Sequence, residues 1–104
     1  MTQAELVQEL KSLGMPVAYS HFIDQVSLPY LVYQFVYSND MMADDVNALE
    51  VSNFQIELYT RTKDLAKEKL VQDKLKSLYL PYHKVETFIE SENLRQVIYE
   101  IQLM

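Results

Sequence analysis

The chain has 104 residues, an apolar share of 49%, no cysteine, one glycine, three prolines and a formal net charge of −6. That length predicts a single domain over residues 1–104, and the apolar share is sufficient for one core. The lack of cysteine excludes disulfides, thiolate metal sites and a cysteine nucleophile, and a single glycine excludes a glycine-rich phosphate loop.

The first predicted element is a helix over residues 2–13. Thr2 and Glu5 have the spacing of a capping box, in which each side chain accepts a hydrogen bond from the other residue's backbone N–H. Gly14 and Pro16 follow as stop signals, because glycine tolerates a left-handed turn and proline cannot continue a helix.

Three strands are expected before the second helix, at residues 17–22, 30–37 and 50–60. The middle segment is almost entirely aromatic and β-branched, which favours a strand. The third alternates apolar and polar residues, which predicts one buried and one wetter face. Residues 38–49 are expected to form a long polar loop without structure of its own.

The second helix is expected over residues 64–79, because Pro81 lies just beyond its end. Two alternating segments follow at residues 83–89 and 94–103, and Asn93 between them suits the positive φ of a hairpin connection. The apolar stripe of the helix comprises Ala66, Leu70, Val71, Leu75 and Leu78.

The resulting order, α-β-β-β-α-β-β, predicts an α+β fold, with a mostly antiparallel sheet of about five strands and two helices packed on one of its faces. Strands joined by short connections are expected to pair antiparallel. The expected core comprises Leu6, Leu10, Leu13, Phe54, Ile56, Leu58, Leu70, Val71, Leu75, Val97, Tyr99 and Ile101.

A short motif occurs twice. Residues 10–13 and 75–78 both have the sequence Leu-Lys-Ser-Leu, and a proline follows each copy at the same spacing. Two interpretations are open, a common way of ending a helix or two related α-β-β units.

Candidate catalytic and metal-binding residues are few. His21 and His83 both fall at strand margins, and no motif supplies a third group that would orient either one as an acid or base. The four acids of residues 38–50 lack the alternating ligand spacing and the glycine of an EF-hand loop. We therefore expect no enzyme activity, no cofactor and no bound metal.

The loop over residues 38–50 is a candidate contact site. Met41 and Met42 stand where a minimal connection would use glycine or asparagine, and methionine is favoured at adaptable contact surfaces. Asp44 and Asp45 add negative charge. Contact with a partner and simple mobility of the loop are both consistent with this composition.

Basic residues gather in residues 61–76, which hold six basic and three acidic side chains, a net charge of +3, whereas the rest of the chain carries −9. One interpretation is a solvated helix face with internal ion pairs. The other is head-to-side self-association, in which Lys67 and Lys74 of one copy approach the acidic loop of another.

The strand over residues 30–37 is apolar on both faces, and Tyr33 and Tyr37 share one of them. A small domain needs only one strongly apolar sheet face, and tyrosine is enriched at protein interfaces. Either the strand is central and covered on both sides by its own chain, or the face with Tyr33 and Tyr37 binds a partner.

Membranes and nucleic acids are disfavoured as partners. The first 13 residues carry three charged side chains, unlike a signal peptide, and the longest apolar-rich run, residues 28–37, has about half the length of a bilayer span. The acidic balance disfavours nucleic acid, because duplex binders concentrate Lys and Arg. We expect a protein that is located, or assembled, in a cytoplasm.

Five segments in strand and hairpin positions carry a family resemblance: residues 16–22 (PVAYSHF), 29–33 (PYLVY), 53–60 (NFQIELYT), 85–92 (VETFIESE) and 96–100 (QVIYE). In order and spacing they resemble a small family of tailed phages and prophages of Gram-positive hosts, the tail completion or tail terminator proteins of siphophages. One departure is Asp64-Leu65, where members of this family often have Asp-Pro at the start of the second helix.

The resemblance implies a small α+β virion subunit that forms a hexameric ring on the finished tail tube. It implies three partners, namely other copies of the chain, a tail tube protein and a head connector or neck protein, with assembly in the host cytoplasm. The alternatives are a neck or head-completion protein of the same virion and, in a different class, a cytosolic adaptor that binds a partner strand at its sheet edge.

Overall fold

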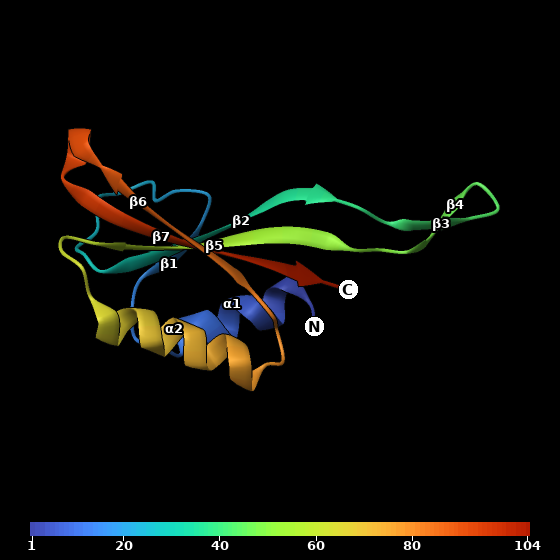
Figure 1. Ribbon diagram of the computed structural model, residues 1–104, viewed down its shortest axis with the longest axis horizontal. Coiled ribbons are helices and arrows are strands. Elements are labelled where there is room, and N and C mark those ends of the chain that lie inside the picture. Colours follow the sequence, from blue (N-terminus) through green and yellow to red (C-terminus); the bar gives the residue numbers. More distant parts are fainter.

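The computed structural model describes all 104 residues and has an α+β architecture (Figure 1). A five-stranded sheet has the strand order β1-β2-β5-β7-β6, and β3 and β4 form a separate two-stranded sheet. Both helices lie on one face of the larger sheet, as expected. In chain order the elements are α1 (Gln3–Lys11), β1 (Val17–Tyr19), β2 (Tyr30–Ser38), β3 (Met41–Ala43), β4 (Val46–Leu49), β5 (Ser52–Thr60), α2 (Leu65–Ser77), β6 (His83–Ile89), the 3-10 helix η1 (Glu90–Glu92) and β7 (Leu94–Leu103).

Each helix begins at a side-chain cap. The expected capping box of α1 is present, with Thr2 and Glu5 each accepting a hydrogen bond of 3.1 Å from the other residue's backbone N–H. At the start of α2, Oδ1 of Asp64 accepts a hydrogen bond of 3.1 Å from the backbone N–H of Lys67. These caps satisfy amide groups that the first turn of a helix leaves without partners.

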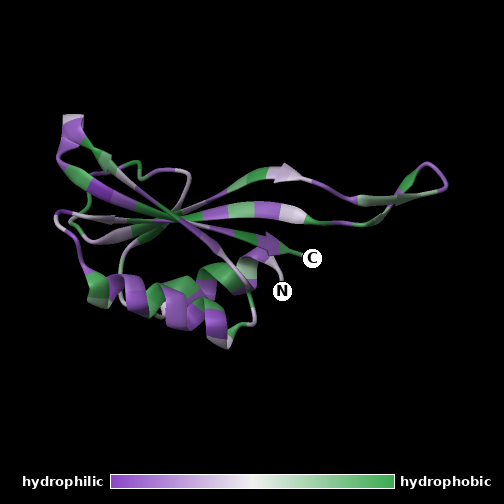
Figure 2. Cartoon of the chain, viewed as in Figure 1, coloured by the Kyte–Doolittle hydropathy of each residue, from purple (hydrophilic) through white to green (hydrophobic).

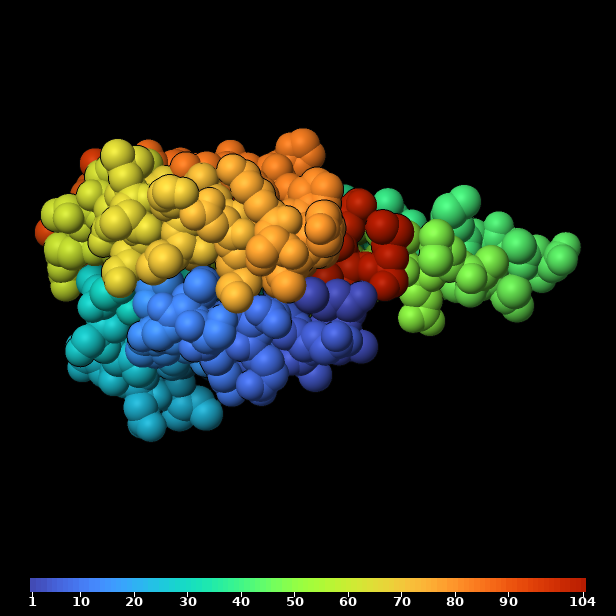
Figure 3. All heavy atoms as spheres, turned by 90° about the horizontal axis from the view of Figure 1, so that it is seen from below, coloured from blue at the N-terminus to red at the C-terminus, as the bar shows by residue number.

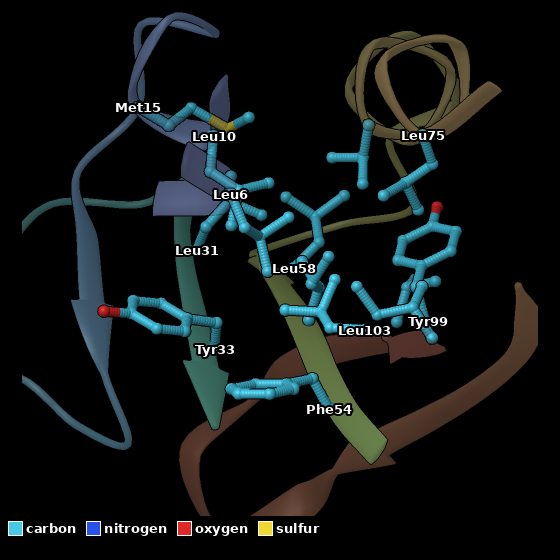
Figure 4. Close-up of a cluster of buried hydrophobic side chains, with 14 residues drawn as sticks. Leu6, Leu10, Met15, Leu31, Tyr33, Phe54, Leu58, Leu75, Tyr99 and Leu103 are labelled. Carbon is cyan, nitrogen blue, oxygen red and sulfur yellow. The ribbon is translucent and has the colours of Figure 1, made fainter. Parts of the chain in front are cut away.

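The core fills the space between the helices and the sheet (Figure 4). Leu6 and Leu10 of α1 and Leu75 of α2 are fully buried, and they meet Leu58 of β5 and Tyr99 of β7. Ten of the twelve residues that the sequence assigns to the core are buried, and Leu13 is partly buried against the cluster.

Leu70 corrects the expected core, because its residue surface is 41% exposed. The side of α2 that faces the sheet carries Glu68, Val71 and Leu75, and Leu70 lies outside that buried set. The prediction from apolar periodicity was wrong at Leu70 because it assumed that only apolar side chains face the sheet. The structure instead buries the carboxylate of Glu68 on that side of α2.

The pairing of β1 also differs from the expectation. β1 is only three residues long, and it pairs parallel to β2, with Val17 opposite Leu31. Residues 20–29 cross the sheet face opposite the helices, where the ring of Phe22 packs edge-on against Tyr30 at a centroid distance of 5.2 Å. This crossover allows a parallel pair without a helix. β6 and β7 pair antiparallel, whereas β1 and β2 pair parallel. The two copies of Leu-Lys-Ser-Leu therefore do not belong to equivalent α-β-β units.

The segment expected to be an unstructured loop is a β-hairpin. β3 and β4 pair antiparallel, and the two residues that join them, Asp44 and Asp45, have φ values of 51° and 65°. A two-residue turn of type I′ needs a positive φ at both positions, and aspartate tolerates it better than most residues. We call residues 38–51 the arm, since this hairpin continues the line of β2 and β5 beyond the body of the molecule (Figure 1).

Candidate interaction surface

The arm exposes apolar side chains that the rest of the chain does not cover. Met41 is 62% exposed and Met42 is 72% exposed, and Val46 and Leu49 are exposed as well. Figure 2 shows apolar residues along this projecting hairpin, away from the core between helices and sheet. A lone two-stranded hairpin is marginally stable in water, so a partner that covered these apolar side chains would stabilise the arm.

The exposed apolar surface continues onto the outer half of β2. β1 pairs only with residues 31–33, so the remainder of β2 lies at a free sheet edge. Phe35, Val36 and Tyr37 are each about half exposed there. Contact surfaces commonly gather aromatic and aliphatic side chains of this kind.

Hydrogen bonds fix the base of the arm. The carboxylate of Asp40 accepts a bond of 2.9 Å from the backbone N–H of Val51 and one of 2.7 Å from Nδ2 of Asn47. The backbone N–H of Asn39 donates to the carbonyl of Val51 at 3.0 Å. Asp40 therefore has a structural role in the arm, whereas Asp44 and Asp45 lie at its exposed tip.

Tyr33 and Tyr37, both candidate interface residues, have different surroundings. Tyr33 is only 8% exposed and belongs to the core, where Tyr19 packs edge-on against it at 5.2 Å. Tyr37 is 56% exposed beside the arm. The strand is thus covered on both faces over its first half and open over its second, so Tyr33 is removed from the candidate surface and Tyr37 stays in it.

The basic segment 61–76 lies apart from the arm, and its lysines differ in their partners. Nζ of Lys74 lies 3.0 Å from the carboxylate of Glu9, so Lys74 joins α2 to α1. Lys69 pairs with Asp73 at 2.7 Å in an exposed pair of the same helix. Lys67 is partly buried, and neither Lys67 nor Lys76 forms an ion pair. Both Lys67 and Lys74 belong to α2, which lies on the body of the molecule and not beside the arm of the same chain (Figure 1).

Glu68 is the most buried charged side chain of this segment, at 3% exposure. Its carboxylate lies 2.8 Å from Nζ of Lys63 and 2.6 Å from Nζ of Lys84, two lysines that α2 itself does not contribute. Burial raises the pKa of Glu68, but hydrogen bonds and charge from the two lysines outweigh it, and the net pKa is lowered. This cluster links α2 to β6.

A second buried carboxylate lies on the opposite face of the sheet. Glu57 is 5% exposed and accepts hydrogen bonds from Gln34 at 2.6 Å, from the Tyr59 hydroxyl at 2.7 Å and from Gln96 at 2.9 Å. Burial, followed by the bond to Glu57, raises the pKa of the Tyr59 hydroxyl. The alternation of β5 predicted a wetter face here but gave no sign of this cross-strand network, which joins β2, β5 and β7.

A hollow of about 600 Å³ lies between the sheet residues next to the arm and the segment that joins α2 to β6. Tyr37, Tyr79, Tyr82 and Met104 are among the residues that line it, together with His83. The other candidate histidine, His21, lines a different hollow formed by residues 20–30 and the neighbouring sheet face. No three side chains of His, Asp and Glu come together in a geometry that could hold a metal ion.

Neither helix is long and apolar enough to cross a membrane. No protein-family model matches this sequence, and comparison with curated proteins gives no match. The candidate site is therefore defined by geometry and charge alone: an acidic, apolar arm at one end of the molecule and a basic helix on its body.

Proposed function

We propose that this chain is a non-enzymatic structural subunit of a phage tail, which caps the tail tube as a hexameric ring and provides the joint to the head connector. The sequence resemblance suggests this role. The arm is the observation that supports it best, because a projecting hairpin with exposed Met41, Met42, Val46 and Leu49 suits a subunit whose neighbours cover it.

The direct test is to purify the chain and to follow its oligomeric state by gel filtration with light scattering, alone and with isolated tail tubes. We expect closed rings that bind the end of the tube. Binding to capsids and not to tubes would favour the alternative role of a neck or head-completion protein. A chain that binds neither assembly contradicts both virion roles.

A variant with a shortened arm tests whether the proposed function depends on the arm. Ser38 and Ser52 are paired, and Asn39 bonds Val51, so an Asn-Gly turn in place of residues 40–50 should close the hairpin at its base. In a phage that lacks the native gene, the native chain should restore tail completion and the trimmed chain should not. Full restoration by the trimmed chain would make the arm a mere connector.

One observation favours a second candidate, the adaptor that binds a partner strand. β6 forms one edge of the sheet, is seven residues long and is exposed over nearly its whole length. Such an edge presents unpaired backbone groups to an extended peptide. Replacing Val85 with proline should abolish strand capture, whereas the same change should leave binding through the arm intact.

A further inference from the structure

We propose that the arm of one copy docks on the outer face of α2 of a second copy, and that this head-to-tail contact is repeated around the assembly. The inference rests on the proposed function, since it names the two surfaces through which the ring would form.

The arm has a composition that disfavours contact with another arm. Residues 38–51 contain four acidic and no basic side chains, a net charge of −4, next to the exposed Met41, Met42, Val46 and Leu49. Two arms placed side by side would bring like charges together. The arm therefore calls for a partner that offers apolar surface and positive charge.

The outer face of α2 offers both properties. Leu65, Lys69 and Lys76 follow one another at spacings of four and seven residues, which places them along one side of the helix. We call these three residues the α2 stripe. Leu65 is 69% exposed, and Tyr79, just beyond the end of the helix, is 91% exposed.

The positive charges of the α2 stripe are available to a partner. Lys76 forms no ion pair, and Lys69 pairs only with Asp73, whose side chain is itself 54% exposed. An exposed pair of this kind contributes little stability and exchanges readily. Residues 61–76 as a whole carry a net charge of +3 and hold six of the nine basic side chains of an acidic chain.

The arm cannot reach the α2 stripe of its own chain. It projects along the longest dimension of the molecule, which measures 49 Å, whereas α2 lies on the body (Figures 1 and 3). The contact must therefore join two copies. Two different surfaces meet in this contact. Where the contact is not reciprocated within one pair of copies, the association is head to tail, and repetition of it gives a ring or a filament.

The test uses two variants with reversed charge. The arm-reversed variant carries Asp44→Asn, Asp45→Gly, Ala48→Lys and Glu50→Lys, which change the net charge of the arm from −4 to +1. Asn-Gly suits the positive φ values of the turn, and Asp40 is kept because it holds the base of the arm. The helix-reversed variant carries Lys69→Glu and Lys76→Glu, which change residues 61–76 from +3 to −1.

Each variant alone should self-associate about tenfold more weakly than the native chain at low salt, because every contact then joins like charges. An equal mixture of the two should recover much of the native association, because every contact again joins opposite charges. In the mixture each reversed arm meets a reversed helix, and each native arm meets a native helix. Sedimentation velocity measures all three samples, and recovery in the mixture shows that both variants are folded.

The repeated motif provides a matched control. Lys11 and Lys76 each occupy the last turn of a helix, within the same Leu-Lys-Ser-Leu sequence, and both are exposed. Lys11→Glu should leave association unchanged, whereas Lys76→Glu alone should weaken it. If the two changes weakened association equally, association would depend only on the net charge of the chain. That result would overturn the proposed contact.

The outcomes separate this inference from the proposed function. The docking of the arm on α2 would be contradicted if both variants formed rings as readily as the native chain, or if their mixture did not recover. Either result would leave the proposed tail role unaffected. Recovery in the mixture, with rings that bind no tail tube, would support the contact and contradict the tail role. A native chain that stays monomeric at all concentrations contradicts the contact itself.

Discussion

Glu68 carries its charge inside the molecule, between α2 and β6, and two lysines make this possible. Lys63 and Lys84 are partly exposed and reach the carboxylate with their ammonium groups. Removing the charge should therefore have an effect on folding that depends on pH.

We predict that Glu68→Gln lowers the free energy of unfolding by about 1–3 kcal/mol near neutral pH. The pKa of Glu68 is lowered in the folded chain, so the unfolded chain binds the proton first as pH falls. Its stabilising effect is present above the ordinary glutamate pKa, about 4.3, and is lost as pH falls through the lower folded value. Urea unfolding at a series of pH values should show a smaller acid loss in Glu68→Gln. Glu92→Gln, an exposed control, should keep the native slope.

Alanine substitutions at two residues of equal size, Ile56 and Leu70, test which residues belong to the core. Ile56 is fully buried, so Ile56→Ala should lower the free energy of unfolding by about 2–5 kcal/mol. Leu70→Ala should change it by less than about 1 kcal/mol, because Leu70 is 41% exposed. Thermal and urea unfolding measure both variants, and a loss at Leu70 equal to that at Ile56 would restore the expected core assignment.

For single residues, sequence patterns predict burial and helix capping correctly where nearby residues in the chain determine them. The inward placement of Phe54, Ile56 and Leu58 and the cap at Thr2 were correct for that reason. Glu57 and Glu68 were missed because their partners come from other elements, and only the folded sheet brings those partners together.

At the scale of elements, the arm is the main difference between expectation and structure. Its sequence lacks the Asn-Gly or Asp-Gly pair that usually announces a two-residue turn, and β3 and β4 are short. Asp44-Asp45 was the signal that could have identified the turn, since aspartate tolerates a positive φ. The parallel pairing of β1 was missed because it depends on the path of residues 20–29 over the sheet.

We predict that the trimmed chain, with Asn-Gly in place of residues 40–50, has nearly the native free energy of unfolding, within about 1 kcal/mol. β3 and β4 pair only with each other, and most of their residues lie in water. Circular dichroism and urea unfolding would measure this. A loss of several kcal/mol would mean that the arm supports the body, and the functional test of the trimmed chain would then need smaller changes.

For the whole molecule, the distribution of charge matters more than its sum. The chain carries −6 in total, yet residues 38–51 carry −4 and residues 61–76 carry +3. Two copies therefore repel at long range, and under the proposed contact they attract only when the arm of one faces α2 of the other.

We predict that self-association weakens as salt is raised from about 50 mM to about 500 mM, because ions screen exposed charges over roughly a Debye length. Analytical ultracentrifugation of the native chain gives the dissociation constant at each salt concentration. Tighter association at high salt would indicate that Met41, Met42 and their apolar neighbours dominate the contact.

The route by which the arm joins the body determines how the molecule bears force. The arm continues directly into β5, the central strand of the sheet, which pairs with β7 over nine residues from Ser52 to Thr60. Hydrogen bonds in an antiparallel pair run across the strands. A pull along the arm therefore loads all of these bonds in shear at once, whereas a sideways pull would open them one after another. We therefore expect the arm to resist tension along its own axis more strongly than a sideways pull.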